Sequence, residues 1–341
     1  MFNCIHIQTY PPHFHYTYNL VNNFKTLTNC KELNIPIFII FDTPEIQEQY
    51  KKKYPESDCN YINLKTIVNS NNFDYLIFEK YKDLCNQNIH IKEWGSGDGF
   101  LSTKEAFHRT YVCVKRLYSI LELERLGYKN VWCIDGESHI FNKVNLNTIF
   151  EKNNILTVGG KNHQGFRPHQ IIKDVFKLDY NSTDKIFDIS IRVNDFWIVN
   201  TNHFKNMVQL INKLHNIPIS HIINGSEQSL YEYYMYDLYL KGENNTKIIE
   251  LDNKFNLEKL NRNMYQYKTQ IEIDNFAEEF NKVYFDKIPV YRGDWWKWVN
   301  RSYNGLYLLN KLNIDIAVSN FQEENRGATL LFTDIEGTLS R

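Results

Sequence analysis

Two carboxylates lie two positions apart in residues 131–141, directly after the four apolar residues of 131–134. They belong to Asp135 and Glu137, and Gly136 between them permits a sharp turn. Ligands of open α/β sheets bind at the carboxyl ends of the strands, so a buried strand here would direct both side chains toward a ligand. Mg²⁺ and Mn²⁺ favour carboxylate oxygens and leave positions for substrate phosphates. The pair is therefore a candidate metal site; the alternative is a polar turn in which Glu137 only caps.

The elements before and after this turn predict an α/β protein. The continuous apolar run 35–41 is typical of a strand buried inside a parallel sheet, and Gly127 is a suitable C′ residue for a long helix that ends at about 126. Alternating strands and helices favour a doubly wound architecture. The pattern predicts strands over 2–10, 35–41, 61–64, 131–134, 155–158 and 196–199, and helices over 15–29, 103–126, 201–214 and 226–240, with another from 44.

The helix that ends at Gly127, the apolar strand and the acidic turn together resemble the GT-A glycosyltransferase family. In that family a D-x-D motif follows such a helix and strand, and the second acid here is Glu137, a variant that some GT-A families use. The specific resemblance is confined to 102–150 and identifies no subfamily. It implies a GT-A-like, Rossmann-related, mixed and mostly parallel sheet flanked by helices over 1–250, with a C-terminal elaboration over 251–341 on the same domain.

The resemblance also implies contacts outside the acidic turn. The nucleotide would be held by residues at the ends of the first two strands, namely Thr9, Tyr10 and Asp42. The diphosphate would be bound by two cations of the long helix, Lys104 and Arg109, and the donor sugar by Asp195, which precedes the strand 196–199. Glu227, which opens the helix 226–240, would be the general base. Each also has a structural explanation as surface, a solvated helix face or a capping acid. Asp135 could serve the ribose as well as the metal, which leaves Glu137 as the more direct ligand.

The C-terminal part contains three Trp residues within four positions, in the segment 291–298. Trp295 and Trp296 could form a platform or lid for a sugar, because indole faces suit sugar rings. GT-A enzymes often supply a third metal ligand, commonly His, from such a segment. No His occurs in 291–298, so Asp294 would have to serve at the catalytic centre. The alternative is a hydrophobic satellite cluster.

These features lead to the expectation of a hexosyltransferase that needs Mn²⁺ or Mg²⁺. It would move a sugar from a nucleotide-sugar donor, UDP- or GDP-linked, to a hydroxyl of a glycan or glycoprotein. One alternative is a metal-dependent nucleotidyltransferase, which is disfavoured because residues 10–13, Tyr-Pro-Pro-His, stand where a glycine-rich phosphate loop is expected. The other is a non-catalytic carbohydrate-binding protein. Neither inversion nor retention at the anomeric carbon follows from the sequence.

Composition excludes some classes of function and bears on location. The net charge of −1 offers no basic excess for a nucleic-acid partner. The six cysteines are scattered without a C-x-x-C pair, as in reduced structural thiols. No signal peptide and no apolar stretch near ~18 residues is found. We therefore expect a cytoplasmic protein, or one of the host cytoplasm or virion if the Asn-, Ile-, Lys-, Tyr- and Phe-rich composition reflects an AT-rich virus.

Three other motifs are given no catalytic role. Residues 331–337 resemble the opening strand of nucleotide cyclases, but too little chain follows for that domain. His13 and His15 flank Phe14 without a nearby acidic partner and are predicted on the surface. His163 and His169, in the polar stretch 161–188, are predicted to lie outside the site.

Overall fold

The structure of the chain is a computed structural model. It describes residues 2–70, 115–136, 138–140, 143–151, 155–158 and 197–215, and short stretches and single residues between 227 and 291: 227, 231, 234–235, 237–238, 241–243, 247–250, 271–272, 274–275, 278 and 290–291.

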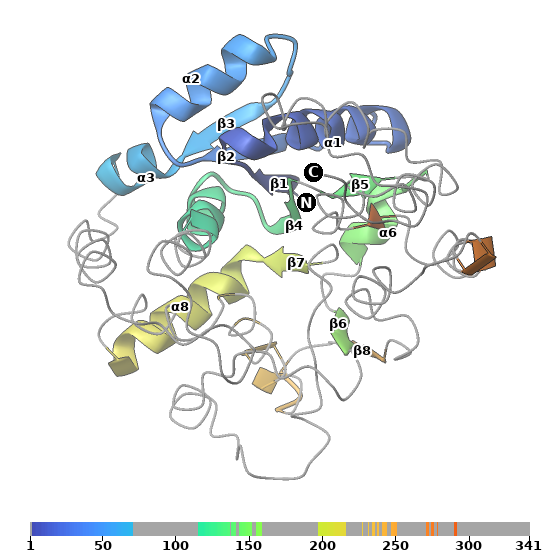
Figure 1. Ribbon diagram of the computed structural model, residues 1–341. Helices are drawn as coiled ribbons and strands as arrows, with labels where there is room; N and C mark the ends of the chain where they lie inside the picture. Colours follow the sequence, from blue (N-terminus) through green and yellow to red (C-terminus); the bar gives the residue numbers. More distant parts are fainter. Residues whose placement is uncertain are drawn as a thin grey trace.

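The centre of the described part is a five-stranded sheet in the order β3-β2-β1-β4-β7 (Figure 1). The first four strands are parallel, and β7 is antiparallel to β4. The chain passes from β1 to β2 and β3 on one side and then returns to add β4 on the other side of β1. This arrangement, with helices on both faces, confirms the expected mixed and mostly parallel α/β sheet. The strands are β1 (Asn3–Gln8), β2 (Ile37–Phe41), β3 (Asn60–Asn63), β4 (Asn130–Asp135) and β7 (Trp197–Asn200).

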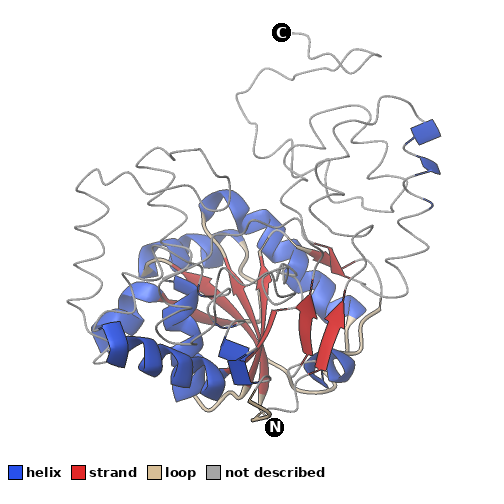
Figure 2. Ribbon diagram, turned by 90° about the horizontal axis from the view of Figure 1, so that it is seen from below, coloured by secondary structure: helices blue, strands red, loops and turns tan. Residues whose placement is uncertain are grey.

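One face of the sheet carries the main apolar core, beneath α1 (Phe14–Leu27) and α2 (Pro44–Lys53) (Figure 1). Figure 2 shows helices on both sides of the strands. Alternate side chains of β1 and β4 point to this face, as the two-residue period of a strand requires. Among them Trp132 is fully buried, and its ring meets that of Phe24 edge to face at 5.4 Å. Helix α2 begins where Thr43 accepts a hydrogen bond from the Ile46 amide and Pro44 occupies the first turn.

The opposite face is covered by the helix of residues 115–125 and by α8 (Thr201–His215), and it contains more polar groups. Lys205 of α8 and Glu124 form an ion pair at 2.9 Å that joins the two helices. The first helix ends as predicted, because Gly127 has a φ of +90° and Tyr128 donates its amide hydrogen to Leu123 O. Among the described helices, none is long and apolar enough to cross a membrane.

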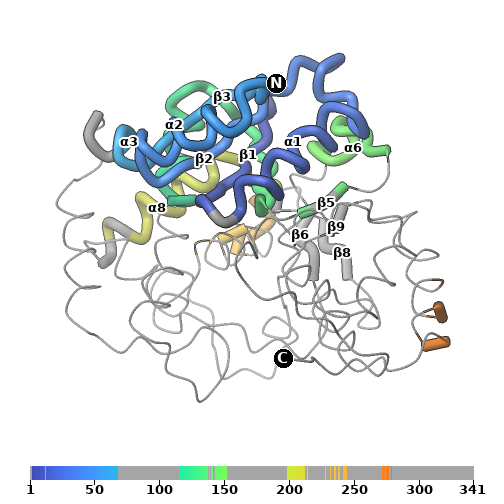
Figure 3. Tube along the Cα trace, turned by 45° about the horizontal axis from the view of Figure 1, so that its top comes forward, coloured from blue at the N-terminus to red at the C-terminus, as the bar shows by residue number. Residues whose placement is uncertain are grey.

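The described part also contains two small sheets and three short helices (Figure 3). β5 pairs with β9 in antiparallel fashion, and β6 pairs with β8 in parallel. The β5–β9 pair connects the segment after the acidic turn with the C-terminal part of the chain. These elements are β5 (His139–Ile140), β6 (Ile155–Val158), β8 (Lys247–Glu250), β9 (Val290–Tyr291), η1 (Pro11–His13), α3 (Leu64–Ser70) and α6 (Leu146–Phe150).

His13 and His15 are buried, and the described cysteines are free thiols. Among the described cysteines, Cys4, Cys30, Cys59 and Cys133 are free thiols. The prediction that His13 and His15 lie on the surface is wrong, since they are only 7% and 6% exposed. Aromatic neighbours cover both rings: Tyr10 contacts His13, and Tyr16 packs on His15 at 4.0 Å between ring centroids. The spacing of two residues did not reveal this local aromatic cluster.

A buried histidine on the polar face predicts a pH-dependent stability. His6 hydrogen-bonds Ser119 at 2.7 Å, and burial, with the nearby positive charge of Arg116, lowers the pKa of His6 from 6.5 to about 3. Between those values the unfolded chain binds one proton more than the folded chain. His6 therefore stabilises the fold fully above pH 6.5, and this contribution falls by up to about 1.4 kcal/mol per pH unit as the pH decreases toward 3.

The measurement is the free energy of unfolding by urea between pH 7.5 and 4, for the unsubstituted chain and for His6→Gln. We expect the slope against pH to be smaller in His6→Gln by up to one proton. Equal slopes for the two proteins would show that His6 does not stay neutral in the folded chain.

Candidate functional site

The candidate site lies where the strand order reverses, at the carboxyl ends of β1 and β4. Asp135 is the last residue of β4 and stands opposite Gln8, the last residue of β1. Thr9 follows directly and donates its amide hydrogen to Ile40 O of β2. In open α/β sheets this reversal point is where ligands bind, because the loops on either side separate there.

The turn after β4 has no room for a side chain at position 136 unless a neighbour or the turn itself moves. A Cβ added to Gly136 would come within 2.5 Å of Thr17 Oγ1 and 2.8 Å of Gln8 O. Thr17 Oγ1 in turn donates to Thr9 Oγ1 at 2.7 Å. The acidic turn is therefore pressed against the end of β1 and the start of α1, which fixes where Asp135 lies.

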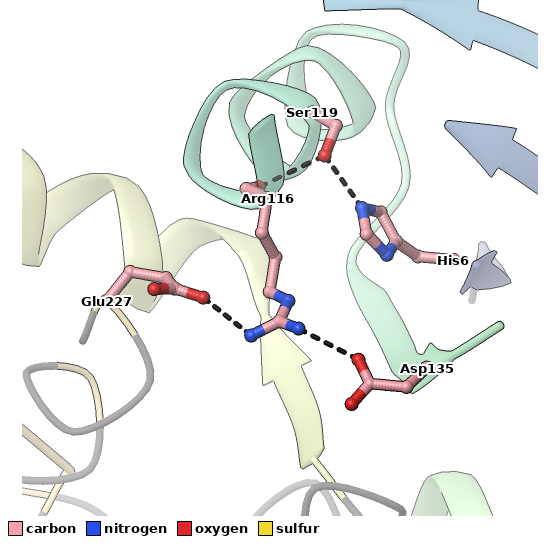
Figure 4. A network of polar contacts seen from close by, with 5 residues as sticks. All are labelled: His6, Arg116, Ser119, Asp135 and Glu227. Carbon is pink, nitrogen blue, oxygen red and sulfur yellow. Dashed lines mark hydrogen bonds and ion pairs between the residues drawn. The ribbon is translucent and has the colours of Figure 1, made fainter. Parts of the chain in front are cut away.

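Arg116 connects Asp135 with the buried Glu227, as Figure 4 shows. Arg116 Nη2 donates to Asp135 Oδ1 at 2.9 Å, and Nη1 donates to Glu227 Oε1 at 2.7 Å. The Asp135 and Arg116 side chains are 16% and 12% exposed, whereas the Glu227 side chain is not exposed at all. The row of charges thus runs from the partly exposed Asp135 to Glu227 in the interior.

Lys115 also connects two groups, at the carboxyl ends of β1 and β2. Its Nζ forms an ion pair with Asp42 Oδ1 at 2.8 Å and donates to Thr9 O at 3.0 Å. Burial lowers the pKa of Lys115, and the negative charge of Asp42 opposes that shift. Lys115 therefore ties the residue after β1 to the residue after β2.

The loop after β1 is fixed by side-chain contacts rather than by glycines. Tyr10 OH lies 2.6 Å from His13 Nε2, and Pro11 begins the short helix η1. Thr9 is only 1% exposed, whereas Tyr10 is half-buried. Of the two predicted nucleotide contacts in this loop, Tyr10 is the more accessible.

The structure brings four of the predicted site residues to this edge of the sheet, has a fifth in the adjoining loop, and leaves the others outside the described residues. Thr9, Asp42, Asp135 and Glu227 are the four, with Tyr10 in the adjoining loop. Their assigned roles, including that of Glu227 as general base, stay predictions. Outside the described residues lie Lys104, Arg109, Glu137, Asp195, Asp294, Trp295 and Trp296, together with His163, His169 and residues 331–337.

Sequence reasoning placed the cations of the long helix at 104 and 109 and missed Lys115 and Arg116. A signal was present, because Lys115, Ser119 and Glu122 are polar, lie at helical spacing, and interrupt an otherwise apolar helix face. All three are less than 9% exposed. Buried polar residues need partners, so such a row predicts a polar interior.

The residues present fit a divalent cation in chemistry but do not form a complete site. Asp135 offers carboxylate oxygens of the kind that Mg²⁺ and Mn²⁺ prefer, and one of them accepts from Arg116. Within the described ranges no group of three or more His, Cys, Asp or Glu side chains could hold a metal. Further ligands would come from Glu137, from the diphosphate or from water.

The pairing of β5 with β9 is relevant to the Trp-rich segment. His139, two positions after Glu137, stands opposite Tyr291, the first residue of the segment 291–298. The chain therefore enters this segment beside the acidic turn.

No known protein family and no curated protein matches the sequence. Among solved structures, the chain resembles core-mannan synthase A (CmsA/Ktr4) from Aspergillus fumigatus in its Mn/GDP form, at 13% identity and a TM-score of 0.39, over 74% of this chain and 73% of that one. It also resembles the mannosyltransferase Ktr4p from S. cerevisiae, at 13% identity and a TM-score of 0.33, over 69% and 62%. A third likeness, to S. aureus TarS at 13% identity and a TM-score of 0.35, covers 96% of this chain but 54% of TarS. This chain thus spans less than two thirds of the last two proteins, and similarity this weak establishes no family.

Proposed function

We propose that the chain is a divalent-metal-dependent glycosyltransferase of the GT-A type. It transfers a hexose from a nucleoside-diphosphate sugar, UDP- or GDP-linked, to a hydroxyl of a glycan or glycoprotein. The observation that carries the proposal is the position of Asp135. It ends β4 at the point where the strand order reverses, and the following residue, Gly136, packs closely against the end of β1.

Each part of the site has a proposed task in binding the donor. The loop after β1, with Tyr10 at its accessible side, receives the base and ribose. Asp135 and Glu137 hold Mn²⁺ or Mg²⁺, and the cation, when bound, offsets the charge that develops on the departing diphosphate. The segment 291–298, which begins opposite His139, supplies Trp295 and Trp296 to the sugar and Asp294 to the catalytic centre. Lys104, Arg109 and Asp195 remain proposed contacts of the diphosphate and the donor sugar.

The loop after β1 supports glycosyl transfer over nucleotidyl transfer. A nucleotidyltransferase of this architecture is expected to cradle phosphates there with backbone amides of a glycine-rich loop. In this chain Pro11 and Pro12 form a short 3-10 helix and lack amide hydrogens, and Tyr10 and His13 contact each other through their side chains. This loop is better suited to contact a base or ribose than to wrap a triphosphate.

The test is a thermal-shift screen of UDP-, GDP-, CMP- and dTDP-sugars, each with and without Mn²⁺, on the unsubstituted chain, Glu137→Ala and the exposed control Glu151→Ala. A nucleotide present at 100 times its Kd stabilises the fold by about 2.7 kcal/mol, which raises the Tm measurably. We expect a shift that depends on Mn²⁺ for at least one UDP- or GDP-sugar, retained in Glu151→Ala and lost in Glu137→Ala. A full Mn²⁺-dependent shift in Glu137→Ala contradicts the proposed metal ligand. No shift across the panel favours a carbohydrate-binding protein.

A further inference from the structure

We propose that Glu227 is a positioning residue, which fixes the Asp135 carboxylate through Arg116 and does not take the proton of the acceptor hydroxyl. The inference rests on the proposed function of the site. It changes the role expected of Glu227 from that of a general base.

The burial of Glu227 is the first argument. A general base must come within hydrogen-bond reach of the proton that it accepts, directly or through one water molecule. The Glu227 side chain is 0% exposed, and its Oε1 already accepts a hydrogen bond from Arg116 at 2.7 Å. Its Oε2 is also buried and has no hydrogen-bond donor among the described residues. An acceptor hydroxyl would have to enter the interior beside Arg116 to reach it.

The geometry of Arg116 is the second argument. Its two terminal nitrogens bind two different carboxylates, so the plane of the guanidinium is fixed at both ends (Figure 4). A single contact between Arg116 and the partly exposed Asp135 would leave the pair free to rotate. The second contact, to a carboxylate that solvent does not reach, removes that freedom. A lysine ammonium is a compact point charge and lacks this fork.

The backbone of Arg116 is held as firmly as its side chain. Ser119 Oγ donates to Arg116 O at 3.1 Å and is also hydrogen-bonded to His6 Nε2 at 2.7 Å. His6 stays neutral because burial, aided by the charge of Arg116, lowers its pKa to about 3. Because His6 is neutral, Arg116 is the group of this network that supplies positive charge to Asp135 and Glu227.

The net charge of the network favours the binding of a cation. Asp135, Arg116 and Glu227 together carry a net charge of −1, and Asp135 is the less buried of the two carboxylates. A cation that approaches Asp135 would meet a carboxylate whose orientation is already set. Groups that orient a metal ligand in this way typically change metal affinity or activity by about 10- to 100-fold when they are removed.

The test compares Glu227→Ala and Glu227→Gln in the unsubstituted chain and in Arg116→Ala, with Arg116→Lys as a second background if Arg116→Ala folds poorly. Exposed Glu243→Gln is the matched control. The readouts are the Kd for the nucleotide with Mn²⁺, measured by titration calorimetry, and urea unfolding. We expect Glu227→Ala to weaken binding by about 10- to 100-fold. Glu227→Gln should weaken it less, because the amide oxygen still accepts from Arg116, and Glu227→Ala should have no further effect in Arg116→Ala.

The rival outcomes are distinct. Normal binding by Glu227→Gln, with transfer reduced by about 10²- to 10⁴-fold and loss of the acid limb of the pH profile, identifies a general base and overturns the inference. Effects of the Arg116 and Glu227 substitutions that simply add, in binding or in unfolding, also overturn it. If the unsubstituted chain binds no nucleotide but the two substitutions are coupled in unfolding, the proposed function fails and the Arg116 bridge stands.

Discussion

Replacing Arg116 by alanine is expected to lower the free energy of unfolding by about 3–5 kcal/mol, the cost of removing one partner of a buried ion pair. The reason is that Glu227 stays behind in the interior with neither Oε1 nor Oε2 paired among the described residues. Asp135 also loses its contact to Nη2, but at 16% exposure it can be hydrated more easily. Urea unfolding at pH 7 measures the effect.

Arg125→Ala is the matched control, because Arg125 lies on the same helix and also pairs with a glutamate, Glu122, three residues earlier. The Arg125 side chain is 54% exposed, so its removal should change stability little. The double variant Arg116→Ala/Glu227→Gln should recover part of the lost stability, since it removes the unpaired charge. Equal losses in Arg116→Ala and Arg125→Ala would mean that Glu227 is not a buried charge.

Strands β2 and β4 were predictable because each one contains a short, continuous run of apolar residues. The run 35–41 predicted β2, and residues 131–134 predicted β4, with boundaries within two residues. The stop at Gly127 was equally clear, since a positive φ is a local requirement. The short pair β5–β9 was not predicted, because it joins residues about 150 positions apart and neither strand is long enough to show a period.

The polar residues of the site were predicted only in part, because their contacts also join residues that are far apart in the sequence. Asp135 and Gly136 could be recognised from their position after an apolar strand. Glu227 was recognised as an acid at the start of a helix, but its burial depends on Arg116, which lies 111 residues away in the sequence. Contacts of this range are set by how helices pack on the sheet, which no local pattern in one sequence specifies.

Gly136→Ala is expected to destabilise the fold by about 1–3 kcal/mol and to weaken binding of the nucleotide with Mn²⁺. The added methyl group would lie 2.5 Å from Thr17 Oγ1 and 2.8 Å from Gln8 O. Thr17 can rotate only by giving up its hydrogen bond to Thr9, and Gln8 O belongs to the backbone at the end of β1. The turn must therefore move away from β1, and Asp135 must move with it.

Gly127→Ala separates the steric cause of this effect from the loss of a glycine as such. Gly127 has a φ of +90°, so alanine is strained there, yet nothing lies within 4 Å of the added Cβ. We expect Gly127→Ala to lower the free energy of unfolding but to leave the Kd for the nucleotide unchanged. Gly136→Ala should change both the free energy of unfolding and the Kd. The reason is that position 136 packs against the end of β1, from which the proposed nucleotide-binding loop starts. If Gly136→Ala keeps the Kd of the unsubstituted chain, Asp135 does not depend on this close contact for its place in the site.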